Sequence, residues 1–198
     1  MTKRIYDAYA VETPIHLSMD EHISHGICVS NLAYAVAKEL GLTEEECHKL
    51  AIAGFLHDIG KIKLNTYVYD REKTFTIDEM RYMRLHPSLG YAILKEREYD
   101  EEILEAVLYH HENFDGSGYP KNLSGEEIPL GGRILRVCDA FGALISNRPC
   151  REAFDKDTAL EIMVEEAKYF DMRVYLAFQR VSHSEEIGKI LDIFGISE

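Results

Sequence analysis

Two adjacent histidines, His110 and His111, stand in the stretch HHENFDGSGYP, directly before a loop marked by glycine and proline. A second doublet, His57 and Asp58, lies in HDIGK, and His86 precedes a proline turn in HPSLG. Imidazole and carboxylate groups are ligands for divalent metal ions, and a carboxylate has two oxygens with which to bridge a pair of ions. Because neighbouring side chains on a helix point about 100° apart, the two doublets indicate more than one ion.

Each of these residues also has an ordinary structural explanation. A histidine at the end of a helix is favoured by the helix dipole without any metal. Glu21 has capping-box spacing from Ser18, although it also lies one turn before His25, so that the two side chains can serve one ion. Lys61 can be a solvated cation at a helix end, and Arg148 a surface charge.

Composition limits the class of protein. The 198 residues are 46% hydrophobic, enough for one sizeable core, so we expect one domain over residues 18–198 preceded by an N-terminal arm at residues 1–17. No stretch has the roughly 20 apolar residues that cross a bilayer, and no signal-peptide pattern opens the chain, so we predict a cytoplasmic protein without a membrane partner. The four cysteines lack the spacing of a zinc site or disulfide framework. A formal net charge of −13 argues against a nucleic-acid polymer as partner.

The elements that must position these residues are helical. Apolar periodicity predicts helices over residues 18–41, 43–60, 76–86, 87–98, 100–112, 133–146, 155–170, 171–182 and 184–195. Thr43 and Glu46 have the spacing of a capping box, and Pro87 stands in a first turn. Gly41 and Gly60 are the predicted ends of the first two helices.

The remaining segments fit an all-α fold. Residues 113–132 form a long loop, and long loops inside compact domains are more often functional than accidental. Residues 66–77 alternate weakly, so at most a small β-hairpin is expected there. In a helical bundle, inward-facing histidines and carboxylates from several helices are the usual way to hold a metal cluster.

The stretches HDIGK, HPSLG, HHENFDGSGYP and RILRVCDAF together resemble the HD-GYP branch of the HD-domain metal-dependent phosphohydrolases. The resemblance covers about residues 18 to 155, and the GYP loop is specific to that branch. It implies a single-domain HD-type helical bundle that hydrolyses cyclic di-GMP to the linear dinucleotide pGpG and, in some members, on to GMP. It also implies a hydroxide that bridges two or three metal ions, typically iron or manganese.

The resemblance assigns roles residue by residue. Eight residues match metal ligands of the family, namely Glu21, His25, His57, Asp58, His86, His110, His111 and Asp139. Asp58 is the expected bridge and, with Lys61, a catalytic residue, since Lys61 matches a cation that protonates the leaving 3' oxygen or contacts phosphate. Tyr119 and Arg148 join Lys61 as substrate-binding candidates, although Tyr119 can equally be a packing anchor for the loop. If Glu21 only caps its helix, the site holds two ions and not three.

Three positions depart from the family pattern. Gly142 stands where an aspartate is usual, Cys150 where an aromatic residue is usual, and Asn122 where a glycine is usual. These changes leave open a second enzyme reading, hydrolysis of another cyclic nucleotide. A third reading is an inactive metal-holding module that binds nucleotide or a protein, and the intact ligand set counts against it. The expected partner is a cyclic dinucleotide, and a homodimer or a signalling-protein partner stays open.

Overall fold

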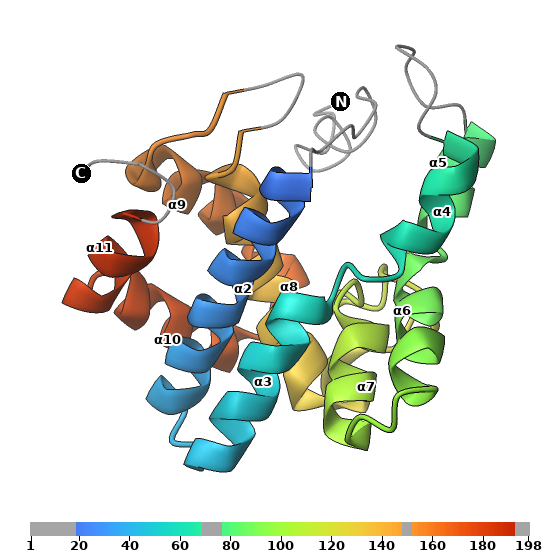
Figure 1. The fold of residues 1–198 in the computed structure, drawn as a ribbon. Helices are drawn as coiled ribbons and strands as arrows, with labels where there is room; N and C mark the ends of the chain where they lie inside the picture. The colour runs from blue at the N-terminus through green and yellow to red at the C-terminus, as the bar shows by residue number, and fades with distance from the viewer. Residues whose placement is uncertain (1–18, 69–76, 148–151, 193–198) are drawn as a thin grey trace.

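The chain folds as a bundle of helices, described by a computed structural model over residues 19–68, 77–147 and 152–192 (Figure 1). The helices are α2 (Met19–Glu39), α3 (Glu44–Leu56), α4 (Lys61–Val68), α5 (Ile77–Met83), α6 (His86–Lys95), α7 (Glu101–Tyr109), α8 (Leu130–Leu144), α9 (Lys156–Glu165), α10 (Met172–Ser182) and α11 (Glu185–Asp192). Two short 3-10 turns are η1 (Gly125–Glu127) and η2 (Ala167–Tyr169). The described residues contain no strand, so the all-α prediction is confirmed.

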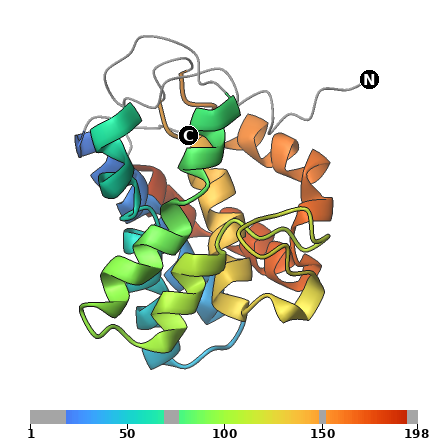
Figure 2. The same ribbon diagram turned by 90° about the vertical axis from the view of Figure 1, so that its right-hand side faces the viewer.

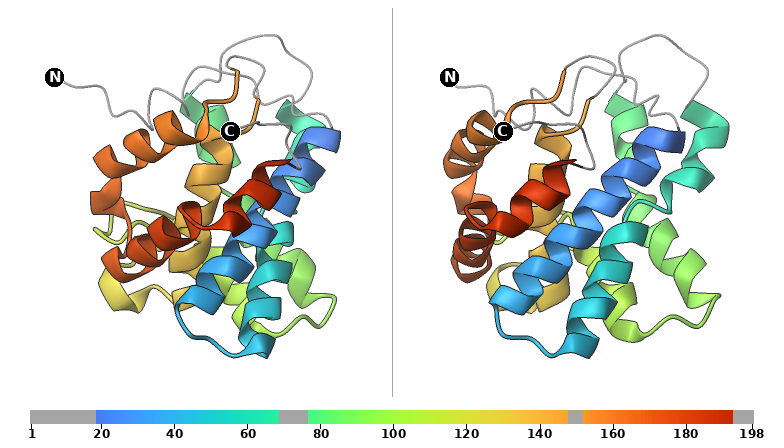
Figure 3. Two further views of the ribbon diagram at one scale, coloured as in Figure 1. Left: turned by 90° about the vertical axis from the view of Figure 1, so that its left-hand side faces the viewer. Right: turned by 60° about the vertical axis from the view of Figure 1, so that its left-hand side comes forward.

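Four helices form the centre of the bundle. Helix α2 packs along α3, and α8 contacts α2, α3 and α7. Helix α6 pairs with α7 on one side of this centre, whereas α10 and α11 lie against α2 on the other side (Figures 1 and 3). From the side, the long loop between α7 and α8 lies next to the C-terminal helices (Figure 2). The bundle therefore surrounds α8 with helices from both halves of the chain.

Helix α8 is the innermost part of the core. Residues 134–142 are all buried, and a helix buried all round is expected only inside a core. Asp139 lies within this run and is itself buried. Burying a carboxylate is costly unless it is paired, so the position of Asp139 already indicates that polar partners converge on it.

The predicted helix signals are confirmed at three positions. Gly41 has a φ of +81°, a left-handed conformation that suits glycine, and it follows the end of α2. The capping box of α3 is complete, because the Thr43 backbone N–H donates to Glu46 Oε2 at 2.7 Å and the Glu46 N–H donates to Thr43 Oγ1 at 3.3 Å. Pro87 lies in the first turn of α6.

One local prediction is wrong, and another is tested only in part. Helix α3 ends at Leu56 instead of Gly60, because His57 caps it and the chain turns through residues 57–60 before α4 begins. Residues 66–68 belong to α4 and Ile77 begins α5, so no hairpin forms in the described part of 66–77. A lone two-stranded hairpin is only marginally stable in water, whereas α4 contacts α6.

Several predictions fall outside the described residues. These are the N-terminal arm at residues 1–17, the cap at Ser18, the hairpin residues 69–76, and Arg148 and Cys150. They stay predictions from the sequence.

Candidate metal centre

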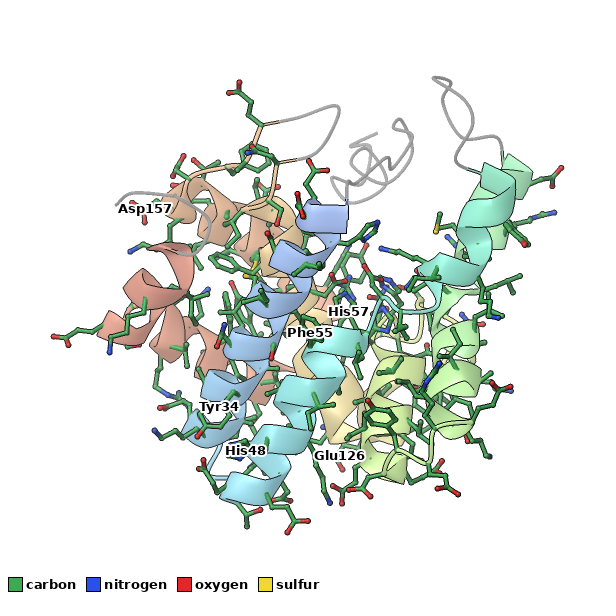
Figure 4. The ribbon with its side chains drawn as sticks, viewed as in Figure 1. Tyr34, His48, Phe55, His57, Glu126 and Asp157 are labelled. Atoms are coloured by element: carbon green, nitrogen blue, oxygen red, sulfur yellow. The ribbon has the colours of Figure 1, made fainter. Side chains whose placement is uncertain are left out.

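Seven of the eight predicted ligands meet in one buried cluster, which we call the His/Asp cluster. Within each of three overlapping groups, one ligand atom per residue lies within 4.8 Å of the others. The groups are His86, His110 and His111; His25, His57 and Asp58; and His57, His110 and Asp139. In Figure 4, His57 lies at the end of α3, where α3, α4, α6 and α7 approach one another. Ends of separate helices thus supply five of the seven residues, while His25 and Asp139 lie within α2 and α8.

Three of the histidines are oriented by the helix that precedes them. His57 Nδ1 lies 2.7 Å from the Gly54 carbonyl oxygen, and His110 Nδ1 lies 2.6 Å from that of Val107. His86 Nδ1 makes the same contact, at 2.8 Å, with the carbonyl of Met83. A carbonyl oxygen only accepts, so Nδ1 carries the proton in each ring and Nε2 keeps its lone pair. The last carbonyls of a helix lack partners within the helix, and here a histidine of the cluster satisfies one of them.

Asp58 lies between two of these imidazoles and a lysine. Its carboxylate oxygens are 3.5 Å from His57 Nε2 and 3.3 Å from His86 Nε2, and Oδ2 is 2.5 Å from Lys61 Nζ. Burial alone would raise the pKa of Asp58, but the charges of Lys61 and His57 hold it well below its ordinary value. The carboxylate is therefore ionised and reaches two imidazoles, as a bridging ligand must.

Asp139 joins residues from distant parts of the chain. Its Oδ1 is 3.1 Å from His25 Nε2 and 3.6 Å from His57 Nε2, and its Oδ2 is 4.0 Å from His111 Nδ1. Burial opposes ionisation, yet the hydrogen bond with His25 and the charge of His57 keep the pKa of Asp139 well below its usual value. Asp139 closes the site opposite Asp58 as a second ionised acid.

Most imidazoles of the cluster are neutral at neutral pH. Burial lowers the pKa of His86 to about 4, and burial with the neighbouring His57 charge holds the pKa of His110 well below its usual value. Burial and His110 do the same to the pKa of His111. For His57, burial alone would lower the pKa, but the Asp58 carboxylate contributes to an overall rise. A neutral imidazole with a free lone pair is the form that binds a metal.

The chemistry of the donor set fits divalent metal ions. His57 Nε2 and Asp58 Oδ1 are fully buried and have no hydrogen-bond partner among the residues that the structure describes. Buried polar atoms are nearly always paired, so two orphans that point into one cluster indicate a ligand that completes them. The nitrogen and carboxylate donors, without thiolate, are those of catalytic sites rather than of structural zinc. The cluster is thus able to hold metal ions.

The sequence argument that the two residues of a doublet point in different directions, as neighbours on a helix do, does not hold. His110 and His111 both belong to one group, and so do His57 and Asp58. Both doublets lie at or beyond the end of a helix, His57 and His110 being the C-caps of α3 and α7. The 100° spacing of a helix therefore does not apply, and each doublet can turn both side chains toward one place.

Glycines allow the ligand segments to approach closely. A Cβ on Gly60 would lie 2.0 Å from the His86 carbonyl oxygen, and one on Gly118 would lie 2.5 Å from the His111 carbonyl oxygen. Both contacts are with backbone, which cannot move aside as a side chain can. The missing side chain of Gly60 thus lets the turn of HDIGK pack closely on the start of α6. The missing side chain of Gly118 lets the loop after α7 pack closely on the His110–His111 segment.

The GYP loop, residues 113–129, is attached to the cluster through Tyr119. The Tyr119 ring stacks on the His111 ring at 4.8 Å between centroids and 24° between planes. Its backbone N–H donates to the His111 carbonyl at 3.1 Å. Burial and the negative charges of Asp139 and Asp58 raise the pKa of Tyr119 well above its usual value, so it stays a neutral phenol. Tyr119 is both packed against a ligand and next to the cluster.

Sequence reasoning missed two residues that fix this loop. Glu112 is buried, and its Oε1 accepts the Lys121 backbone N–H at 2.6 Å. Arg136 on α8 is also buried, and its Nε–H donates to Asn113 Oδ1 at 2.8 Å. The sequence contained one signal for Glu112. It is a charged residue directly before the long loop, where its side chain can bind the loop backbone. Nothing in the periodicity of α8 distinguishes Arg136.

The remaining candidates lie around the cluster. Glu21 is half-buried in the first turn of α2, and the three groups of potential ligands do not include it. Gly142 lies directly against His25, since a Cβ on it would be 3.3 Å from His25 Cε1. Gly142, which differs from the family pattern, is therefore beside a predicted ligand. Asn122, which also differs from that pattern, has a φ of +57°, a conformation that Asn tolerates.

The fold and the cluster define a class of protein, and comparison with known proteins identifies it. A family model described as "HD domain" matches residues 7–174, so the chain belongs to the HD-domain family. The HD-GYP assignment is confirmed. An HDG"Y"P protein from Bdellovibrio bacteriovorus has the same fold, with a TM-score of 0.66 and 21% identity over 84% of this chain and 54% of that chain.

Curated relatives share more of the sequence. The cyclic di-GMP phosphodiesterase response regulator RpfG of Xanthomonas campestris pv. campestris (strain 8004) is 41% identical over 155 residues, which are 77% of this chain and 41% of RpfG. The 3'3'-cGAMP-specific phosphodiesterase 3 of Vibrio cholerae serotype O1 is 34% identical over 130 residues, 66% of this chain and 28% of the relative. The chain thus spans less than half the length of these relatives. Among the described helices, none combines the length and the apolar character needed to cross a membrane.

Proposed function

We propose that this protein is a metal-dependent phosphodiesterase that hydrolyses cyclic di-GMP to pGpG, with GMP as a further product. The observation that supports this most strongly is the His/Asp cluster, in which buried donor atoms of His57 and Asp58 lack hydrogen-bond partners within the described part of the chain. The stacked Tyr119 places the GYP loop beside that cluster. Relatives at 41% and 32% identity are named cyclic di-GMP phosphodiesterases.

The proposed ligands are the seven residues of the cluster, with Glu21 as the eighth. Two ions would bind the other six cluster residues, and Glu21 and His25, one turn apart on α2, would hold a third. Iron or manganese is the proposed metal, because imidazole and hard carboxylate donors suit these ions. When bound, the ions supply an acidified water and neutralise phosphate charge.

Lys61 has a double role in this proposal. Its ammonium pairs with Asp58 at 2.5 Å, where it offsets the charge of a buried acid. Lys61 would leave Asp58 when that carboxylate binds an ion, and its ammonium would then be available to the leaving 3' oxygen or to a phosphate oxygen. Tyr119 and Arg148 are the proposed substrate contacts, with a neutral phenol as donor at Tyr119 and a planar fork at Arg148.

The test begins with the protein purified without oxygen and loaded with iron or manganese. Metal analysis and chromatography of cyclic di-GMP, pGpG and GMP measure loading and turnover. Asp58→Ala should lower turnover at least about 1000-fold, because several kcal/mol of metal-based stabilisation are lost, and should remove most of the metal with helicity retained. Asp157→Ala is the control, since Asp157 is exposed and far from the cluster (Figure 4). Normal turnover in Asp58→Ala would refute the mechanism.

The third ion has its own variant. Glu21→Ala should lower the metal content by one ion per chain, while the seven-residue cluster keeps its ions. An unchanged metal content would show that Glu21 binds no ion and only caps its helix.

A second substrate is favoured by one observation. Gly142 lies against His25, so the site differs from the family pattern next to a proposed ligand, and a relative at 34% identity is named a 3'3'-cGAMP-specific phosphodiesterase. The same chromatographic assay with 3'3'-cGAMP decides between the substrates. A fully metal-loaded protein that cleaves neither would be the binding module instead.

The proposed location is the cytoplasm. Cys28, Cys47 and Cys138 are free and buried, as is usual where thiols stay reduced. A homodimer or a signalling protein stays a proposal for the protein partner.

A further inference from the structure

An arginine that no sequence motif singled out lies on the outer side of the GYP loop tyrosine. Arg84 is exposed in the turn between α5 and α6, and its guanidinium carbon is 5.2 Å from the centroid of the Tyr119 ring. The same ring stacks on His111 at 4.8 Å. The Tyr119 ring therefore contacts both His111, a member of the His/Asp cluster, and the exposed Arg84.

The turn that carries Arg84 is fixed by the cluster itself. His86, two residues later, holds the Met83 carbonyl through its Nδ1 at 2.8 Å. The backbone on both sides of Arg84 is thus part of the ligand scaffold. The face of an aromatic ring attracts a guanidinium without using its N–H donors, so the Tyr119 ring positions Arg84 while its donors stay available.

The charge of Arg84 is not balanced by a carboxylate within the described ranges. Two other cations of these helices are paired: Arg81 lies 3.8 Å from Asp78, and Lys61 lies 2.5 Å from Asp58. Arg84 has no ion pair among the same residues, although the chain carries a formal charge of −13. A guanidinium that lies over the Tyr119 ring and has no carboxylate partner among the described residues is suited to an anionic ligand.

We propose that Arg84 binds the phosphate of the cyclic dinucleotide that is not being cleaved, with Tyr119 as its platform. A cyclic dinucleotide has two phosphates, and the ions of the cluster would take only the one that reacts. The second phosphate then needs a cation at the rim, and a guanidinium fork matches phosphate oxygens in shape and charge. This inference rests on the proposed function and adds a substrate-binding residue to it.

The test compares Arg84→Gln with Arg81→Gln, an exposed arginine on α5 in the preceding turn. Loss of a charge-assisted contact should raise KM for cyclic di-GMP about 10- to 100-fold, with kcat and metal content close to wild type. Arg81→Gln should stay within about twofold of wild type. Arg84→Lys keeps the positive charge but not the planar guanidinium, so its KM for cyclic di-GMP should lie between those of wild type and Arg84→Gln. An unchanged KM, or an equal loss in both glutamine variants, would overturn the proposal.

Two further measurements separate phosphate binding from a packing role. Bis(p-nitrophenyl) phosphate has a single phosphate, so its hydrolysis should not distinguish Arg84→Gln from wild type. Tyr119→Ala should raise KM for cyclic di-GMP, and the double variant should be less impaired than the two single effects predict, because the platform and the guanidinium act together. Additive effects, or equal damage with the single-phosphate substrate, would contradict Arg84 and its Tyr119 platform as a phosphate site.

Failure of the proposed function is recognisable separately. If the metal-loaded wild-type protein cleaves no cyclic dinucleotide, the hydrolase proposal fails, and calorimetric binding of cyclic di-GMP then tests Arg84 alone. A Kd about tenfold weaker or more in Arg84→Gln supports the contact, whereas equal affinities, or no binding to wild type, refute it.

Discussion

The two halves of the His/Asp cluster are held in place by different means. His57, His86 and His110 each bond through Nδ1 to a carbonyl three residues earlier in the chain. His25 and Asp139 instead meet across 114 residues, at 3.1 Å, where α2 packs against α8. The first half is local in sequence, and the second depends on the packing of two distant helices.

This difference shows which part of the site is sensitive to packing. A tethered histidine is oriented once its preceding helix forms, because the carbonyl it caps belongs to that helix. The His25–Asp139 pair requires close packing, since a Cβ on Gly142 would already be 3.2 Å from Val29 and 3.3 Å from His25. We therefore expect the packed half to be the weaker point of the cluster.

The largest effect is expected from Asp139→Ala, which breaks the packed half. His25, His57 and His111 would lose their shared acid, while the Nδ1 bonds of the tethered histidines would remain. Turnover should fall at least about 1000-fold, and metal content should fall only in part. Metal analysis and cyclic di-GMP turnover measure both, with Asp157→Ala as the control. Complete metal loss would show that the tethered half does not bind ions by itself.

A smaller effect is expected where the two ligand turns touch. Gly60→Ala places a Cβ 2.0 Å from the His86 carbonyl oxygen and 2.6 Å from Gly90 N. The free energy of unfolding should therefore be about 1–3 kcal/mol lower than that of wild type. Denaturant unfolding with a chelator present measures this without the contribution of bound metal.

Gly188→Ala is the matched control for this substitution. No atom of the described residues lies within 4 Å of a Cβ at Gly188 in α11, so alanine there should be neutral or stabilise by up to about 1 kcal/mol. Equal stabilities of the two variants would contradict the tight approach at Gly60.

The smallest effect is expected from the N-cap of α3, and it tests the histidines that are bonded to their own preceding helix. Thr43→Ala removes the N-cap of α3, the helix whose other end holds His57. Stability should fall by about 1 kcal/mol, which corresponds to a melting temperature lower by roughly 2–4 °C, and the metal content should not change. Glu46→Gln keeps a hydrogen-bonding side chain and should lose less. A metal content that fell with the cap would show that His57 depends on the whole length of α3.

The sequence predicted much of the fold because its signals are local. Gly41, Thr43, Glu46 and Pro87 act within one turn of a helix end, and the structure has helix ends there. The prediction failed at Gly60, since the end of α3 is set by a ligand side chain, His57, that caps the helix. A glycine looks like a helix stop in sequence, whereas here its missing Cβ serves a contact with a segment 26 residues away.

The cluster was predicted from motif order, and its surroundings were not. The family resemblance named seven residues that the fold brings together, but it gave no role to Glu112, Arg136 or Arg84. Their roles come from contacts with residues distant in sequence, such as Asn113 for Arg136 and Tyr119 for Arg84. Single-sequence periodicity carries no information on such pairs.

By itself, the sequence determined most of the helices, though not α4, several of their caps and the types of donor atoms, because these follow from short-range backbone geometry and from side-chain chemistry. Only the tertiary structure decided that both members of each doublet point to one place, that His25 reaches Asp139, and that Tyr119 lies between His111 and Arg84. Those arrangements depend on how helices pack around a buried α8, and packing is a property of the whole core.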